Sequence, residues 1–326
     1  MVVRSIMVLS ALLAACPAAA DTPPPIETQS SAVTAGLVDP AAEVLTLEEE
    51  DNRRLTIPVR IDGIGPFDFM IDTGSQATAV TREINDSLQL RPAGTAMLVG
   101  MASRRAVDLV EVARLDIGSH TITDLSAPVL EREHVGADGI VGLDSLQDFR
   151  VLLDFREQTI AVEDMREQNA SSRGFEIVVR ARQQLGQLLI TDAVVEGVRA
   201  TVIIDTGAQA SIANNALRDR IRTKRAADVT TIDVNGVDLV GQMSLMRELT
   251  IEGLSLTNVP LTFAEAPAFD ALGLTDVPTL SLGMQHLALF DRVAIDFANR
   301  RVMFDLPRDL ARAMRAARRG GQSFRF

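Results

Sequence analysis

The sequence predicts an all-β protein built from two similar lobes in one chain. The residues Asp-Thr-Gly occur twice, at 72–74 and 205–207, and each copy follows an apolar run. The two Asp residues are 133 positions apart (205 − 72), which is about the length of one small domain. Short apolar segments with turn signals recur in the same order around both copies, and few segments have a helical pattern. A tandem repeat of β-rich lobes accounts for all of these observations.

The first landmark of each repeat is a hairpin whose second strand leads into Asp-Thr-Gly. Residues 55–61 alternate apolar and other side chains before a turn at Gly63, a pattern typical of a strand. Residues 188–195 and Gly197 are the counterparts in the second repeat. A second apolar strand then ends in the Asp of each copy, so each Asp is predicted to lie at the tip of a hairpin arm.

Two further landmarks follow each Asp-Thr-Gly in the same order. An apolar segment ends at Gly142 in the first repeat and at Gly283 in the second. A strand ending in Asp-Phe comes next, at residues 151–155 and 293–297, and a polar turn then leads into another apolar strand. The recurrence indicates that the chain repeats one β-rich unit.

These landmarks divide the chain into segments of different character. They predict a signal peptide (1–20), a disordered tether (21–52), an N-terminal lobe (53–165), a linker (166–174), a C-terminal lobe (175–306) and a basic tail (307–326). The basic tail is expected to fray in solvent, and a short amphipathic helix on an anionic surface is the alternative. The tether is rich in Pro, Ser, Thr and acidic residues, which disfavours a packed structure. Short helices are expected within residues 81–88 and 214–221.

The first twenty residues have the pattern of a bacterial export signal. One charge, Arg4, precedes an apolar run that is too short to span a bilayer comfortably. Cleavage after Ala20 follows the small-residue rule, whereas Leu-Ala-Ala before Cys16 resembles a lipobox, in which this cysteine is lipidated. The sequence leaves both alternatives open. Both predict a periplasmic or secreted protein, and the second adds a lipid anchor.

The composition argues against several classes of function. The formal net charge is −12, whereas nucleic acid selects basic faces. The three His residues lack metal-ligand spacing, there is one Cys, and no phosphate-binding loop is present, so neither a metal nor an organic cofactor is expected. Trp and Tyr are absent, which argues against the aromatic girdles of an outer-membrane barrel.

The pair of Asp residues indicates the chemistry. A carboxylate does not normally lie beside a hydrophobic strand without a partner, and Asp72 and Asp205 can be partners of each other. Two close carboxylates cannot both ionise, so they share a proton. The ionised member takes a proton from a bound water and the protonated member donates to a peptide carbonyl, which gives a tetrahedral gem-diol.

The residues around the two Asp have supporting roles in this interpretation. The Thr hydroxyls can lock the two loops together, and the motif glycines allow a backbone N–H to approach the carboxylate closely. The downstream glycine segments can screen the site from bulk water. The supporting residues are Thr73, Gly74, Ser75, Gly142, Thr206, Gly207, Ala208 and Gly283.

The residue that follows each copy makes the two repeats unequal, because Ser75 corresponds to Ala208. A hydroxyl at Ser75 can hydrogen-bond the outer oxygen of Asp72 and favour its charged form. No such donor follows the second copy. We therefore predict that Asp72 is more often the ionised member of the pair.

Gly100 and Gly236 each lie between two apolar strands. They can be the tips of flaps that close over a substrate and exclude water. They can equally be ordinary hairpin turns. The sequence does not decide between these two interpretations.

Taken together, these residues resemble the aspartic proteases, which are the reference case for a proton-sharing carboxylate pair. The resemblance covers residues 53–306 and is closest to retropepsin-like domains, to which residues 140–146 are particularly similar. It implies that Asp72 and Asp205 are the catalytic pair and that the Thr residues interlock. Retropepsins usually build the pair from two chains, whereas the tandem here implies a monomer with an intramolecular pair. Pairing of each lobe with a second molecule is the alternative.

Two departures from the family pattern concern the second lobe and the flap. Ser281 stands where the first repeat has Ile140, and Gln285 stands where it has Asp144. The chain also lacks the flap tyrosine of pepsin-like enzymes. The resemblance implies an aspartic-type endopeptidase that binds an extended polypeptide. The alternative is a peptide-binding or scaffold protein that uses the same fold without cleavage.

Overall fold

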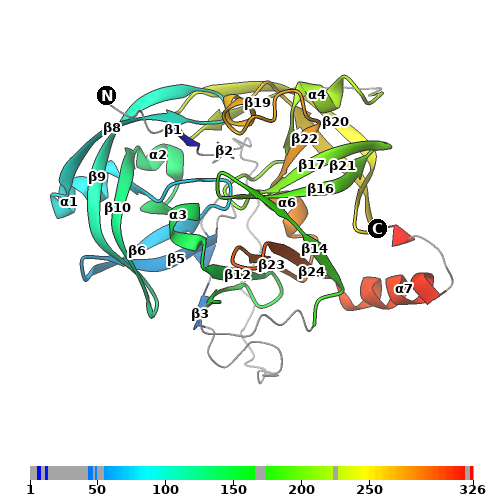
Figure 1. Cartoon of the computed structure of the whole chain (residues 1–326), viewed down its shortest axis with the longest axis horizontal. Coiled ribbons are helices and arrows are strands. Elements are labelled where there is room, and N and C mark those ends of the chain that lie inside the picture. Colours follow the sequence, from blue (N-terminus) through cyan, green and yellow to red (C-terminus); the bar gives the residue numbers. More distant parts are fainter. Residues whose placement is uncertain are drawn as a thin grey trace, which may run out of the picture.

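The computed structural model shows two β-rich lobes side by side, with a smaller sheet below them that takes strands from both (Figure 1). The residues described are 55–165, 174–222 and 227–319, with the short segments 6–8, 12–13, 43–46, 48–49 and 324–325. The described helices are few and short. The all-β class and the two-lobed architecture predicted from the sequence are confirmed.

The N-terminal lobe is a nine-stranded sheet that curls so that β5 pairs with both β6 and β9. Its strand order is β1-β8-β9-β10-β7-β11-β6-β5-β4. The elements are β1 (Ile6–Val8), β4 (Glu48–Glu49), β5 (Leu55–Ile61), β6 (Ile64–Ile71), β7 (Ala79–Thr81), α1 (Arg82–Leu88), β8 (Arg91–Val99), β9 (Arg104–Ile117), β10 (His120–Leu130), α2 (Arg132–Val135), β11 (Gly139–Val141) and α3 (Leu143–Leu146). The end of β6 is buried because β5 and β11 flank it on both sides.

The C-terminal lobe repeats this plan in a ten-stranded sheet of order β15-β16-β17-β22-β18-β21-β20-β19-β2, with β25 paired to β21. The elements are β2 (Leu12–Leu13), β15 (Arg182–Gln184), β16 (Gln187–Val195), β17 (Val198–Ile204), β18 (Ile212–Ala213), α4 (Asn215–Arg218), β19 (Ala227–Asp233), β20 (Asp238–Ile251), β21 (Leu254–Phe263), α5 (Pro267–Ala271), β22 (Thr279–Leu282), α6 (Met284–Leu287) and β25 (Phe324–Arg325). The run β17-β22-β18 corresponds to β6-β11-β7, so both Asp-Thr-Gly loops leave equivalent strands.

The third sheet ties the lobes together. Its order is β14-β24-β23-β12-β13-β3, with β3 at Glu43–Thr46, β12 at Phe149–Asp154, β13 at Thr159–Asp164, β14 at Ile177–Arg180, β23 at Arg292–Asp296 and β24 at Arg301–Asp305. The antiparallel pair β12–β23 joins the first repeat to the second directly. The Asp-Phe strands recognised in the sequence therefore form the base that both lobes share.

Three predicted segments differ from expectation or fall outside the described residues. Strands β3 and β4 lie within the predicted tether, so residues 43–46 and 48–49 pair with β13 and β5, where a disordered segment was predicted. Strands β1 and β2 lie within the predicted signal peptide and pair with β8 and β19. Cys16 and all of the predicted linker except Gly174 lie outside the described residues.

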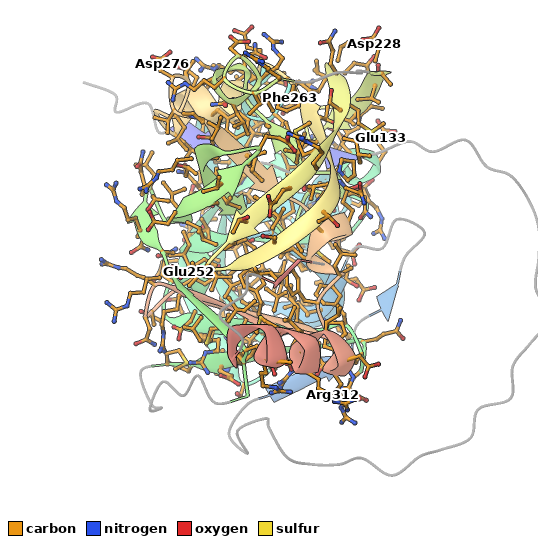
Figure 2. All side chains as sticks on the ribbon, turned by 90° about the vertical axis from the view of Figure 1, so that its right-hand side faces the viewer. Glu133, Asp228, Glu252, Phe263, Asp276 and Arg312 are labelled. Carbon is orange, nitrogen blue, oxygen red and sulfur yellow. The ribbon has the colours of Figure 1, made fainter. Side chains whose placement is uncertain are left out.

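The predicted basic tail also differs, because residues 308–319 form helix α7 (Arg308–Arg319). A helix was the alternative to a frayed tail, and its Ala311 and Met314 are buried in the main apolar core, not placed on an outer anionic surface. Figure 2 shows α7 crossing the molecule below β20 and β21, with Arg312 on its outer side. No helix among the described residues is long and apolar enough to cross a membrane.

A buried ion cluster holds the shared sheet across the lobe boundary. Arg150 on β12 lies opposite Glu163 on β13 and Asp296 on β23. Its guanidinium donates to both carboxylates, at 3.2 Å and 3.0 Å, and all three side chains are less than 10% exposed. Burial alone would raise the pKa of Asp296, but hydrogen bonds from Asn299 and Arg150 outweigh it and lower the pKa below its usual value.

We predict that Arg150→Met destabilises the protein by about 3–5 kcal/mol, because it removes the cation that two buried carboxylates share and leaves Asp296 with Arg301, at 3.0 Å, as its remaining ion-pair partner. The matched variant Arg199→Met removes an exposed pair with Asp192 and should cost less than about 1 kcal/mol. Urea unfolding of both variants measures the difference. Similar losses for the two variants would contradict a special role of the buried cluster.

Candidate active site

The structure places both predicted Asp residues at equivalent positions in the two lobes. Asp72 follows β6 and its N–H donates to Val141 O at 3.1 Å, while Asp205 follows β17 and its N–H donates to Leu282 O at 3.1 Å. Both Asp side chains are fully buried. The apolar segments before Gly142 and Gly283 therefore form the strands that hold the two Asp loops.

The two carboxyl groups lie next to each other at the junction of the lobes. A side-chain carbon added to Gly207 would collide with the carboxyl group of Asp72. The N–H of the same glycine donates to Asp205 Oδ1 at 3.1 Å. Gly207 thus contacts one carboxyl group and donates to the other, and no larger residue fits between them.

The two threonines interlock as predicted from their positions. Thr73 Oγ1 donates to Ile204 O at 2.8 Å and accepts the N–H of Thr206 at 3.2 Å. Thr206 Oγ1 donates to Ile71 O at 2.7 Å and accepts the N–H of Thr73 at 3.0 Å. Each hydroxyl therefore pairs with the backbone of the opposite lobe, and the two loops are held as one unit.

The surroundings of the pair favour one retained proton. Burial and the neighbouring Asp72 charge raise the pKa of Asp205 well above its usual value. Three hydrogen bonds oppose this rise: Gly207 N and Ala208 N donate to Oδ1, and Ser281 Oγ donates to Oδ2 at 2.7 Å. Asp72 Oδ1 accepts the N–H of Gly74 at 2.8 Å.

The role predicted for Ser75 is wrong. Its hydroxyl donates to Ala77 O at 2.8 Å, within its own loop, and not to Asp72. The hydroxyl that reaches a carboxylate is Ser281, which donates to Asp205. The prediction that Asp72 is the more often ionised member thereby loses its basis. The sequence signal for the true donor was the replacement of Ile140 by Ser281 in the repeat.

The downstream glycines are required by close packing. A side chain at Gly142 would collide with the backbone of Ala77, and one at Gly283 would collide with the backbone of Ala210. The N–H of Gly142 donates to Thr78 Oγ1, and the N–H of Gly283 donates to Ser211 Oγ. Both segments therefore lie against the Asp loops.

The two lobes differ in what supports these hydroxyls. Thr78 Oγ1 donates to Asp144 in the first lobe, at 2.6 Å. In the second lobe Ser211 Oγ is hydrogen-bonded to His286 Nδ1, also at 2.6 Å. His286 is buried, and burial lowers its pKa to about 4. His286 takes the place of Ser145, whose hydroxyl lies 2.6 Å from Thr78 Oγ1 in the first lobe, and Gln285 takes the place of Asp144. The second lobe thus has a neutral imidazole behind its Asp loop where the first lobe has a hydroxyl group, and it has an amide where the first lobe has a carboxyl group.

The turns at Gly100 and Gly236, the two candidate flap tips, meet across the lobe boundary and are called the flap turns below. Asp233 Oδ2 accepts the N–H of Ala102 at 3.0 Å and the hydroxyl of Ser103 at 2.8 Å, across the lobe boundary. Its Oδ1 accepts the N–H groups of Asn235 and Val237 in its own turn. Gly100 packs against the same carboxylate so closely that a side chain would collide with it. Gly236 has a positive φ of 75°, which favours glycine.

Each flap tip also inserts an apolar side chain into the opposite lobe. Met101 is buried in a cluster with Ile203 and Ala208, which flank Asp205. Val234 is buried in a cluster with Met70 and Ile140 of the first lobe. Both flap turns therefore pack against the segments that carry the Asp loops.

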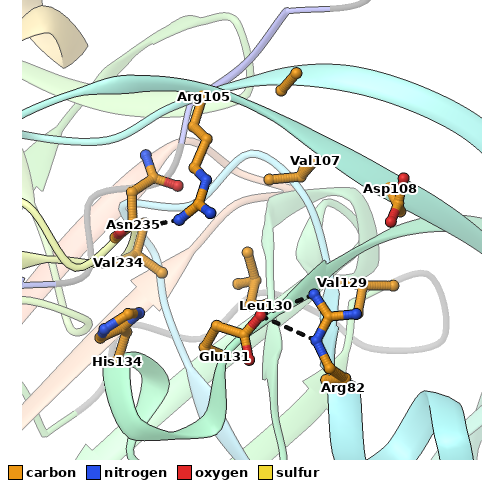
Figure 3. Close-up of a pocket in the computed structure, with 11 residues that line it drawn as sticks. Arg82, Arg105, Val107, Asp108, Val129, Leu130, Glu131, His134, Val234 and Asn235 are labelled. Atoms are coloured by element: carbon orange, nitrogen blue, oxygen red, sulfur yellow. Dashed lines mark hydrogen bonds and ion pairs between the residues drawn. The ribbon is translucent and has the colours of Figure 1, made fainter.

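A cavity of about 190 Å³ lies beside the second flap turn (Figure 3). Arg105, His134 and Asn235 line it, and neither Asp of the pair does. Arg105 Nη1 donates to Asn235 O at 3.5 Å, and Gly236 packs against the His134 ring. The cavity therefore marks the seam where the C-terminal flap rests on the N-terminal lobe.

Comparison with known families agrees with this arrangement. A family model described as aspartyl protease matches residues 57–145 and, separately, residues 191–286. The two matches cover more than half of the chain, and each contains one Asp-Thr-Gly copy. The chain belongs to the aspartyl protease family, and it carries two tandem retropepsin-like lobes, as the sequence predicted. No curated protein matches the chain.

We predict that His286 makes the protein less stable at acid pH. Its folded pKa, about 4, lies below the unfolded value of about 6.5. The unfolded state therefore binds more protons between these values, and stability falls by about 3 kcal/mol in total as the pH drops from about 6.5 to 4. His286→Asn removes this contribution. The difference in unfolding free energy between the two proteins, measured across this range, should change with pH, and a constant difference would contradict the prediction.

We predict that Asp233→Ala loosens the contact between the flaps, because four hydrogen bonds lose their acceptor. The amides of Ala102 and Val237 should exchange with solvent at least about tenfold faster, which corresponds to about 1.4 kcal/mol of lost protection. Asp238→Ala, an exposed residue beside the same turn, is the matched control and should leave exchange unchanged. If these amides are protected equally in Asp233→Ala and wild type, the hydrogen bonds of Asp233 do not hold the two flap turns together.

Proposed function

We propose that the protein is an aspartic endopeptidase in which Asp72 and Asp205 activate one water molecule between them. The observation that carries this proposal is the junction of the lobes, where interlocked Thr residues bring two buried carboxyl groups together. Burial and mutual repulsion favour a pair that shares one proton. Such a pair supplies a general base and a general acid at the same site.

In the proposed reaction the ionised carboxylate takes a proton from the water as its oxygen attacks the peptide carbonyl carbon. The protonated carboxyl group donates its proton to the carbonyl oxygen, and a gem-diol forms. Proton transfer to the amide nitrogen then releases the amine, and the carbonyl re-forms as a carboxylic acid. No metal or organic cofactor takes part in these steps.

An extended polypeptide is the proposed substrate. One edge of strand β8 pairs in parallel with residues 6–8, and one edge of strand β19 pairs in antiparallel fashion with residues 12–13. Both strands therefore have edges that can hydrogen-bond an extended main chain, which is how strand-adding peptide sites obtain affinity. Apolar side chains such as Met97, which packs against the cluster that contains Met101, are suited to form subsites for substrate side chains.

A monomer in the periplasm or outside the cell is proposed, with Cys16 as the candidate lipid anchor. Both threonines of the interlock come from one chain, which supports a site complete within a single molecule. The export pattern of residues 1–20 supports the location. Gel filtration of the mature protein and mass determination of its N-terminus test the two parts of this proposal.

We predict that Asp72→Asn and Asp205→Asn each lower peptide cleavage by at least about 10²–10⁴-fold, because each removes one member of the acid–base pair. A peptide library incubated with wild type between about pH 3 and 7, with and without pepstatin, defines the activity. Asp154→Asn is the matched control, since Asp154 accepts only turn N–H groups. It should keep full activity.

The same experiment separates the enzyme from the alternative. Tight binding of library peptides by wild type, with no product at any pH, would contradict the hydrolase and support a peptide-binding protein. Cleavage that survives in both Asp→Asn variants would place the chemistry elsewhere. Thermal unfolding of each variant shows whether a loss of cleavage reflects lost chemistry or lost structure.

A further inference from the structure

We propose that Ser281 is a positioning residue of the carboxyl pair, whose hydroxyl orients Asp205 and stabilises its charged form. The proposal rests on the proposed function, since it assigns a role to this residue in that reaction. It is carried by three observations: the contact itself, the absence of an equivalent hydroxyl in the first lobe, and the apolar strand in which the serine lies.

The contact is short and buried. Ser281 Oγ donates to Asp205 Oδ2 at 2.7 Å, and the serine is only 3% exposed. The other oxygen, Oδ1, accepts the N–H groups of Gly207 and Ala208 at 3.1 Å and 3.0 Å. Donors therefore engage both oxygens of this carboxyl group, and only the one at Oδ2 comes from a side chain. Ser281 thus orients the Oδ2 side of the Asp205 carboxyl group.

The first lobe has no hydroxyl at the matching position. Ile140 on β11 is paired in register with Met70, and Ser281 on β22 is paired with Ile203. Each partner lies two residues before its Asp, so Ile140 and Ser281 are structural equivalents. Ile140 is buried in an apolar cluster, and the hydroxyl of Ser75 is engaged by Ala77 O. The two equivalent strand positions therefore differ in this one side-chain donor.

Ser281 occupies a position in its strand that is otherwise suited to an apolar residue. All four residues of β22 are buried, and its neighbours Leu280 and Leu282 are fully enclosed. Burying a hydroxyl in such a place is unfavourable unless it is paired. The pairing with Asp205 offsets that cost, and the acceptor is one of the two groups that carry the proposed chemistry.

The expected effect follows from the direction of the bond. A hydroxyl that donates to a carboxylate favours the charged form, and here it opposes burial and the neighbouring charge. Without the hydroxyl, the Asp205 carboxyl group should lose its proton at higher pH. A net hydrogen-bond contribution of about 1 kcal/mol corresponds to a shift of about 0.7 pH unit.

The test compares Ser281→Ala, which removes the donor, with Ser281→Thr, which retains it. Ile140→Val is the matched control, because it trims the equivalent position without touching a hydrogen bond. The pH profile of kcat/KM is measured for each protein. Ser281→Ala should shift one limb upward by about 0.5–1 pH unit and lower kcat several-fold with little change in KM. Ser281→Thr and Ile140→Val should keep the wild-type profile.

The limb of the pH profile that shifts shows which carboxyl group ionises first. A shift of either limb supports the proposal. A shift of the acidic limb means that Asp205 ionises first, and a shift of the alkaline limb means that Asp72 does. Profiles of Ser281→Ala and wild type that coincide would overturn the role of the hydroxyl. Equal loss of rate in Ser281→Ala and Ile140→Val would reduce Ser281 to a packing residue.

A second measurement stands apart from turnover. The carboxyl carbon of Asp205 is titrated by ¹³C NMR in substrate-free wild type and Ser281→Ala, with Asp205→Asn giving the assignment. An upward shift in Ser281→Ala supports the proposal even if no peptide is cleaved, in which case only the proposed function fails. Coincident titrations overturn the proposal even if the enzyme is active. Should Ser281→Ala fail to fold, Ser281→Cys, a weaker donor of similar size, takes its place.

Discussion

The arrangement of the whole molecule depends on the reciprocal hydrogen bonds of Thr73 and Thr206. Each hydroxyl accepts an N–H from the opposite loop and donates to a carbonyl of the opposite strand. Neither loop can satisfy these buried groups alone, and buried polar groups without partners are costly. The close approach of the two carboxyl groups, which is unfavourable by itself, is therefore enforced by neutral hydrogen bonds that flank it.

The lobes are joined at three levels, and each uses a different interaction. The shared sheet joins them at the base through the β12–β23 ladder and the buried Arg150 cluster. The threonines join them at the centre. The flap tips join them at the opposite end, through Asp233 and two buried apolar side chains. The base is continuous sheet, whereas the tips meet through turn residues, so the lobes are expected to separate more readily at the flap turns than at the base.

Most of the fold was predictable because the repeat displays its own landmarks. Asp-Thr-Gly, the downstream glycines and the Asp-Phe strands are local patterns, and each kept its place in the structure. What could not be predicted depends on contacts between distant segments. The hydroxyl of Ser75 had a nearer acceptor in its own turn, and the donor to Asp205 came from a strand 76 residues away. The basic tail was predicted to fray, with a helix as the alternative, and the packing of Ala311 and Met314 on the core favours the helix at residues 308–319.

The differences between the lobes have a physical consequence that depends on the tandem arrangement. In a dimer of identical chains with two-fold symmetry, any side chain beside one carboxyl group is present beside the other. Here Ser281 and Ile140 occupy equivalent positions, as do His286 and Ser145 behind the loops. A single chain can therefore give its two carboxyl groups different donors and different neighbours. A pair that shares one proton gains from such inequality, because unequal sites favour one location of the proton over the other. Ser281 is thus a donor beside one carboxyl group and not the other, which a symmetric dimer of this lobe cannot have.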